Sequence, residues 1–273
     1  MLCCDNNSTR RRGTLTQEQP QYHVRLTTGQ VGRYVLMPGD PARCELIAAY
    51  LEGAQRIASN REYTTYTGTL AGTPVSVTST GIGSPSSAIA IEELAAIGAD
   101  TFIRVGTSGA LRNDLRTGDV VIAQAAVREE GTTPHYVPLS YPAVAHTQVL
   151  RALEDGAQRI GVPTRSGIVS STDALYADLA PHAMPLAVLR AGDWQTVWSR
   201  AGVLAAEMEC AAFFVVATVR GLRAGGVLTV VNSTGEGEIG MSVASLSLDP
   251  MIRVAIAGVE ELIKADAATT AGA

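Results

Sequence analysis

The chain has few aromatic residues, which make up 5% of its 273 residues, with three Phe and two Trp. Its core must therefore be built from Ala, Val, Ile and Leu, within a hydrophobic content of 46%. Basic residues are also few, and the formal net charge is −5. Binding along a nucleic-acid backbone requires a basic surface, so this balance argues against a nucleic-acid partner. It leaves room for a small anionic substrate held by a few buried arginines.

Cysteine is sparse, and Cys3, Cys4, Cys44 and Cys210 show neither a CxxC metal spacing nor a disulfide framework. This usage predicts reduced thiols and a cytoplasmic protein. No apolar run approaches the length of a membrane-spanning helix, so no membrane association is expected. Residues 1–19 contain Arg10, Arg11 and Arg12 but no apolar segment behind them. They are not a secretory signal, and we expect a disordered leader.

Beyond the leader, short apolar runs alternate with helical patterns. This alternation predicts an α/β fold with a mixed sheet between two layers of helices. No linker or repeat interrupts it, so we expect one domain over residues 20–264 and a loose tail over 265–273. Strands are predicted at Tyr34–Met37, Thr73–Thr78, Thr101–Val105, Val120–Ala126 and Val227–Val231, and helices at Ala42–Leu51, Ser84–Leu94, His146–Ile160, Ala206–Arg220 and Pro250–Ala265.

A glycine-rich turn opens the segment Ser79–Leu94, whose sequence is STGIGSPSSAIAIEEL. Gly81, Gly83 and a run of small residues lead directly into the predicted helix. The unpaired N–H groups at such a helix start suit an anion. Many α/β proteins turn tightly into a helix for packing alone, so the turn by itself leaves both explanations open.

Charged residues also occur within apolar segments. Arg104 interrupts the strand sequence TFIRV, and a buried arginine needs an anion or a carboxylate partner. It is either a ligand for an anionic substrate or half of a structural ion pair. Glu207 and Glu209 stand in an Ala-rich segment predicted to be helical. They are either exposed helix-surface acids or acceptors for a hydroxylated ligand.

Together these segments resemble the nucleoside phosphorylase family, in the branch of the uridine phosphorylases and hexameric purine nucleoside phosphorylases. The likeness runs from about Tyr34 to about Lys264 and is greatest to uridine phosphorylases. It implies a three-layer αβα fold with a mixed, partly closed central sheet, no cofactor, and inorganic phosphate as co-substrate. The motifs are GDPAR at 39–43, NREYTTY at 60–66, STGIGSPSSAIAIEEL at 79–94, FIRVGTSGAL at 102–111, YPAVA at 141–145 and EME at 207–209.

The resemblance also implies ligands for phosphate and ribose. We expect phosphate to be bound by Gly39, Arg43, Arg104 and Thr107, and by Arg61 of a neighbouring subunit. Ribose is expected on Met208 and Glu209, with His23 donated across a dimer interface. This sharing implies a homo-oligomer, and relatives of this branch are usually hexamers built from three dimers. Some also bind a monovalent cation near the positions of Glu62 and Ser79; no other metal is expected.

The base site departs from both family signatures. Uridine phosphorylases recognise the uracil edge with a Gln and an Arg, where our alignment places Leu179 and Pro181. Purine enzymes protonate the base with an Asp, where this chain has Ser233. If the alignment is shifted by a gap, His182, Arg190 or Asp193 could compensate. The remaining residues expected at the base are Ser108, Gly109, Leu175 and Asn232, and Ser108, Asn232 and Ser233 are the candidates for assisting its departure.

The reaction implied is reversible phosphorolysis of a nucleoside to ribose 1-phosphate and free base, with an altered or broad base preference. One alternative is a purine nucleoside phosphorylase, and another is a nucleoside- or phosphate-binding protein that has lost turnover. A hydrolytic nucleosidase is less favoured, because those enzymes bind no phosphate and use the Asp that Ser233 replaces.

Overall fold

The computed structural model describes residues 19–176, 194–232 and 246–271. The strands are β1 (Tyr34–Met37), β2 (Glu52–Asn60), β3 (Tyr63–Leu70), β4 (Thr73–Thr78), β5 (Thr101–Ala110), β6 (Val120–Glu129), β7 (Ala143–Val144), β8 (Thr164–Thr172), β9 (Ala205–Glu207) and β10 (Arg223–Asn232). The helices are α1 (Ala42–Ala48), α2 (Ser84–Ala96), α3 (Thr147–Arg159), α5 (Trp194–Arg200), α6 (Cys210–Val219) and α7 (Asp249–Ala271), with a short 3-10 helix η1 (Thr133–His135).

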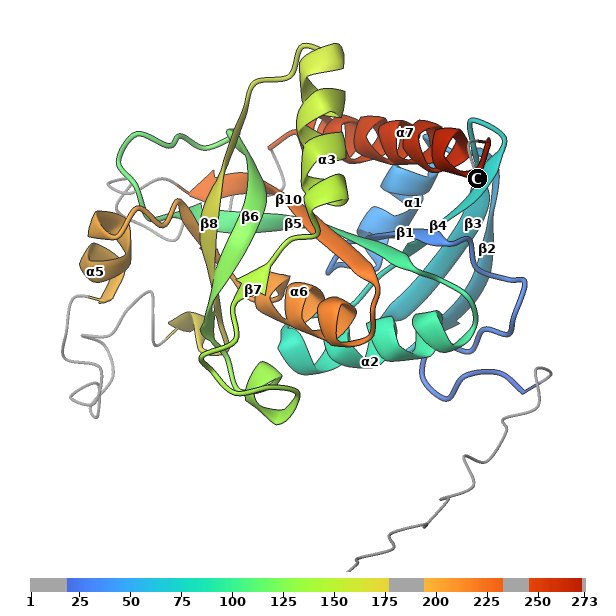
Figure 1. Ribbon diagram of the computed structural model, residues 1–273, viewed down its shortest axis with the longest axis horizontal. Helices are drawn as coiled ribbons and strands as arrows, with labels where there is room; N and C mark the ends of the chain where they lie inside the picture. The colour runs from blue at the N-terminus through green and yellow to red at the C-terminus, as the bar shows by residue number, and fades with distance from the viewer. Residues whose placement is uncertain (1–18, 177–193, 233–245, 272–273) are drawn as a thin grey trace, which may run out of the picture.

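All of these strands belong to one sheet (Figure 1). Its order is β10-β6-β8-β9-β5-β1-β4-β3-β2, with β7 beside β6, and β10 also pairs with β5. This second pairing of β10 closes β5, β9, β8, β6 and β10 into a ring, while β1, β4, β3 and β2 extend from it. Parallel pairs such as β1–β5 coexist with antiparallel pairs such as β2–β3. The predicted mixed, partly closed sheet is confirmed.

Helices cover both faces of this sheet, as Figure 1 shows. Helix α2 packs against α6 on one face, and α3 packs against α7 on the other. The sequence of strand β5 is almost continuously apolar at its start. Neighbouring residues of a strand point to opposite faces of the sheet, and helices cover both faces here. Phe102 joins the core under α2 and α6, whereas Ile103 and Val105 join the core under α3 and α7. The three-layer αβα architecture is therefore confirmed.

The five predicted strands are present, and β5, β6 and β10 are longer than predicted. The helix predicted over Ala206–Arg220 is wrong at its start. Residues Ala205–Glu207 form strand β9, and α6 begins only at Cys210. The EME motif thus spans a strand end and a turn rather than a helix, because β9 pairs with both β5 and β8.

The expected loose tail over 265–273 is also wrong as far as Ala271, because α7 continues to that residue. Asp266 fixes this last part of the helix. It accepts hydrogen bonds from Tyr34 Oη at 2.6 Å and from Arg223 at 2.7 and 2.9 Å. The predicted leader lies outside the described residues except for Gln19. Among the described helices, none combines the length and apolar character needed to cross a membrane.

Candidate active site

Two loops lie side by side at the sheet edge, residues 38–41 after β1 and the glycine-rich residues 79–83 after β4. The amides of Thr80 and Gly81 donate to the carbonyls of Pro38 and Gly39, each at 2.9 Å. These bonds continue the parallel β1–β4 ladder beyond the two strands. Gly81 and Gly83 adopt φ angles of 71° and 95°, which residues other than glycine rarely adopt. The sheet therefore holds both loops in a fixed relation to β5.

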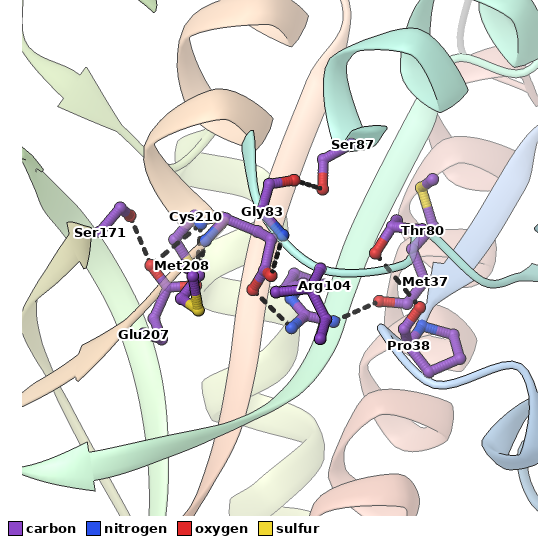
Figure 2. Close-up of polar contacts among 12 residues, drawn as sticks. Met37, Pro38, Thr80, Gly83, Ser87, Arg104, Ser171, Glu207, Met208 and Cys210 are labelled. Carbon is purple, nitrogen blue, oxygen red and sulfur yellow. Dashed lines mark hydrogen bonds and ion pairs between the residues drawn. The ribbon is translucent and has the colours of Figure 1, made fainter. Parts of the chain in front are cut away.

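Arg104 lies beside these loops and is 4% exposed. Its Nη2 donates to Glu209 Oε2 at 2.6 Å, and its Nη1 donates to the Met37 carbonyl at 3.3 Å (Figure 2). Its Nε has no hydrogen-bond partner among the described residues. The guanidinium lies against Gly106, where a Cβ would fall 2.8 Å from Cζ. The carboxylate partner predicted for a buried Arg104 is thus Glu209.

Glu209 is 3% exposed and stands directly before α6, as its N-cap residue. Its Oε1 accepts the Gly83 amide at 2.7 Å, at the start of α2. Ser84 Oγ also donates to the Met208 carbonyl at 3.1 Å, which ties the two helix starts together. The Gly83 amide at the α2 N-terminus is therefore occupied by the protein's own Glu209 carboxylate. Glu209 and Met208, both predicted ribose ligands, lie next to the glycine-rich loop after β4, and Glu209 also bonds Arg104.

Glu207 is the second buried acid of the EME motif, with 5% exposure. It accepts the amides of Glu209 at 2.8 Å and Cys210 at 2.9 Å, and the hydroxyl of Ser171. Burial, and then the nearby Glu209, raise the pKa of Glu207, while the Ser171 hydrogen bond and Arg104 oppose the rise. The alternative of two helix-surface acids is excluded, because both side chains are buried and bonded.

Arg43 is the second residue of α1, which follows the loop after β1. Burial lowers its pKa, Asp40 opposes this, and the neighbouring Arg104 guanidinium lowers it further. Two cations that act on each other electrostatically favour an anion near both. Gly39 lies against Arg104, because a Cβ there would be 3.5 Å from both of its Nη atoms. Gly39 and Arg104 are thus brought together, the charge of Arg104 acts on Arg43, and Thr107 is half-buried three residues further along β5.

Arg61 and His23 are not part of this cluster. Arg61 is exposed at the turn between β2 and β3, with a φ angle of 53°. His23 Nδ1 lies 2.6 Å from Glu93 Oε1, and the His23 amide also donates to that carboxylate. Arg61 is therefore on the surface of this chain, whereas His23 is partly buried against Glu93.

The predicted base residues are only partly described. Ser108 is 3% exposed, and its Oγ has no partner among the described residues. Gly109 makes room for Asn232, because a Cβ at 109 would lie 2.7 Å from Asn232 Oδ1. Leu175 is 42% exposed. The remaining positions, Leu179, Pro181, His182, Arg190, Asp193 and Ser233, lie outside the described residues.

The positions at which some relatives bind a monovalent cation, Glu62 and Ser79, are adjacent in the structure. Ser79 Oγ donates to the Glu62 carbonyl at 2.6 Å and accepts the Thr64 amide at 2.8 Å. The Glu62 side chain packs beside Gly81, where a Cβ would lie 2.8 Å from its Cγ. Across residues 19–176, 194–232 and 246–271, no three His, Cys, Asp or Glu side chains gather to hold a metal ion.

Three contributions to the site are absent from the predicted ligand set. Gly83 binds Glu209 through its amide, Gly106 leaves space for the Arg104 guanidinium, and Glu207 bonds the start of α6. The glycines are visible in the sequence as a Gly-x-Gly turn and a glycine two residues after a strand arginine. The sequence indicates the role of Glu207 more weakly, through an acidic residue that stands shortly before a run of small residues in a helix.

Comparison with known proteins gives consistent results. The uridine phosphorylase of Treponema pallidum is 44% identical over 247 residues, which cover 90% of this chain and 95% of that protein. The uridine phosphorylase of Thermococcus kodakarensis is 47% identical over 226 residues, 82% of each chain. The guanosine phosphorylase of Halorubrum lacusprofundi is 39% identical over 214 residues, 77% of this chain and 82% of that protein. The model of the phosphorylase superfamily matches residues 33–253, and the chain belongs to this family.

Proposed function

We propose that this protein is a nucleoside phosphorylase of the uridine phosphorylase type. The observation that carries the proposal is the buried Arg104, which lies against Gly39 in the loop after β1 and is bonded to Glu209. One guanidinium thus adjoins both a place for an anion and a carboxylate able to accept hydroxyl hydrogen bonds. A phosphate site next to a sugar site is the arrangement that phosphorolysis requires.

In this reaction a phosphate oxygen bonds to C1′ of the nucleoside as the C1′–N bond breaks. The bonding electron pair leaves with the base, which takes up a proton, and the products are ribose 1-phosphate and free base. Positive charge builds on the sugar ring, as in glycoside hydrolysis. Phosphate held by Gly39, Arg43, Arg104 and Thr107 offsets that charge, while Glu209 and Met208 hold the ribose. Catalysis is then mostly positioning and electrostatics.

The base preference we propose is altered or broad, with uridine or a close pyrimidine analogue among the substrates. Its basis is the sequence, in which Leu179, Pro181 and Ser233 replace the polar residues of both specificity signatures. Strong discrimination arises when a wrong substrate leaves buried polar groups unpaired, and such fixed groups are fewer here. The relatives named for uridine and for guanosine are compatible with either base class.

We further propose a homo-oligomer, expected to be a hexamer of three dimers, in which His23 and Arg61 complete a neighbour's site. Support comes from the exposure of Arg61 and from His23, which is 29% exposed and bonds Glu93 of α2 rather than a residue of the Arg104 cluster. A cytoplasmic location fits the buried, unpaired thiols of Cys44 and Cys210.

The test is release of free base from uridine, thymidine, inosine and adenosine, each measured with and without phosphate. Release of uracil that depends on phosphate and yields ribose 1-phosphate supports the proposal. Exclusive release of purines supports the purine alternative, and release without phosphate supports a nucleosidase. Binding of nucleoside without any release indicates a protein that lacks turnover. A preference above about 10⁴-fold for one base would contradict broad specificity.

A further inference from the structure

The start of α6 leaves its first backbone amides in need of acceptors, as every helix start does. The side chain of the N-cap residue usually fills this role. Here the N-cap residue is Glu209, and its side chain makes no such bond. Its carboxylate is instead turned toward the Gly83 amide and Arg104.

Glu207 supplies the missing acceptors from two residues earlier (Figure 2). Its Oε2 accepts the amides of Glu209 and Cys210 at 2.8 and 2.9 Å, and its Oε1 accepts the Cys210 amide at 3.0 Å. Ser171 Oγ donates to Oε1 and in turn accepts the Ala211 amide at 2.9 Å. The positive end of the helix dipole favours a carboxylate at this place.

We propose that Glu207 is a positioning residue for the ribose site. It accepts the main-chain amides of Glu209 and Cys210, so the Glu209 side chain does not have to cap the helix and can face the sugar. This inference rests on the proposed function, in which Glu209 accepts the ribose hydroxyls. It explains why two buried acids occur two residues apart beside one guanidinium.

The charges support this division of roles. Three N–H or O–H donors and the helix dipole offset the charge of Glu207, and Arg104 and the Gly83 amide offset that of Glu209. Replacing Glu207 leaves buried amides unsatisfied at the residue that carries the ribose carboxylate. We expect Glu209 to shift, and misplacement by about 1 Å is enough to cost up to 100-fold in rate.

The experiment compares kcat/KM for uridine and 2′-deoxyuridine in the wild-type protein and in Glu207→Gln. A residue that acts through Glu209 affects the ribonucleoside more, because only that substrate offers a 2′-hydroxyl. We expect kcat/KM for uridine to fall roughly tenfold and the uridine-to-deoxyuridine ratio to fall with it. Ser171→Ala, which removes one donor to Glu207, should change the ratio in the same direction by a smaller factor.

Glu130→Gln is the matched control. Glu130 is 6% exposed and also accepts two backbone amides, at 2.7 and 2.9 Å, and a threonine hydroxyl. These hydrogen bonds go to Thr132 and Thr133 at the start of η1 and not to the candidate site, so we expect no change in the ratio. The Tm of each variant shows whether a loss of activity comes from an unfolded protein or from a misplaced Glu209 in a folded one.

Equal losses for both substrates in Glu207→Gln and Ser171→Ala would overturn the inference, since they would show a merely structural role. A wild-type protein that does not distinguish the two substrates would also overturn it. Absence of phosphorolysis by the wild-type protein contradicts the proposed function instead, so the two failures are distinguishable.

Discussion

The guanidinium of Arg104 lies against the backbone of Gly106, the second residue after it on the same strand. A Cβ at 106 would lie 2.8 Å from Cζ and 2.9 Å from Nη2. The missing side chain at 106 therefore sets the position of the cation that connects the two halves of the site.

Gly106→Ala should move the Arg104 guanidinium without straining the backbone, because Gly106 is not among the glycines with positive φ. We expect the phosphate KM to rise by roughly tenfold, because the anion loses a positioned donor. Steady-state kinetics with varied phosphate measures the change. Gly131→Ala is the control, since its nearest contact would be an ordinary 3.5 Å. An unchanged phosphate KM in Gly106→Ala would show that Arg104 does not bind phosphate.

Arg104→Ala should abolish turnover and also destabilise the protein. It leaves Glu209 buried without its cation, which typically costs about 3–5 kcal/mol. The double variant Arg104→Ala/Glu209→Ala should regain part of that free energy of unfolding while remaining inactive. Denaturant unfolding and phosphorolysis assays check the two expectations separately. A single variant as stable as the double one would mean that the ion pair contributes little.

Mixing two inactive variants tests whether a second subunit completes the site. In oligomers that exchange subunits, Arg61→Ala and Glu209→Ala proteins should together regain some activity, because certain interfaces contain one site free of both changes. Mass spectrometry of differently labelled subunits proves the exchange. No recovery after proven exchange would place Arg61 and Glu209 in the same subunit's site.

Asp266→Asn should weaken the end of α7 by about 1–2 kcal/mol, because the carboxylate accepts bonds from Arg223 and Tyr34. Hydrogen bonds from Arg223 lower the pKa of Asp266, with Tyr34 adding to the effect and burial opposing it. A lowered folded-state pKa stabilises the protein above the unfolded value of about 3.9. The wild-type advantage should thus be constant near neutral pH and shrink as the pH falls below about 4.

Unfolding at several pH values, with Glu260→Gln on the same helix as control, measures this difference. Glu260 pairs with Arg159 at a more exposed position, where an ion pair contributes up to about 1 kcal/mol. A wild-type advantage that persists undiminished at pH 3 would exclude the proposed origin.

Sequence patterns predicted the fold well where short apolar runs were bounded by glycine or proline. Strands β1 and β4 match their predicted bounds, whereas β2 was not predicted, because most of its residues are exposed. Local patterns also contain no information on the pairing of β10 with β5, which joins residues about 120 positions apart. The resemblance to a family, rather than periodicity, supplied the closed part of the sheet.

The sequence proposed residues for a site but not how they are arranged. Arg43, Arg104 and Glu209 were identified, but their mutual arrangement depends on long-range packing of α1, β5 and α6. The helix predicted at Glu207 was wrong because Ala-rich segments suit both a short buried strand and a helix. Strand pairing on both sides of Ala205 and Ala206 decided between them.

The hydrogen bonds between the loop after β1 and the glycine-rich loop after β4 have a thermodynamic consequence. Thr80 and Gly81 are fixed to Pro38 and Gly39 by the same kind of ladder that orders the sheet. Ordering one residue's backbone costs about 1–2 kcal/mol of conformational entropy. Since these residues are ordered when the chain folds, a ligand that binds there meets a preorganised surface and loses little affinity to loop ordering.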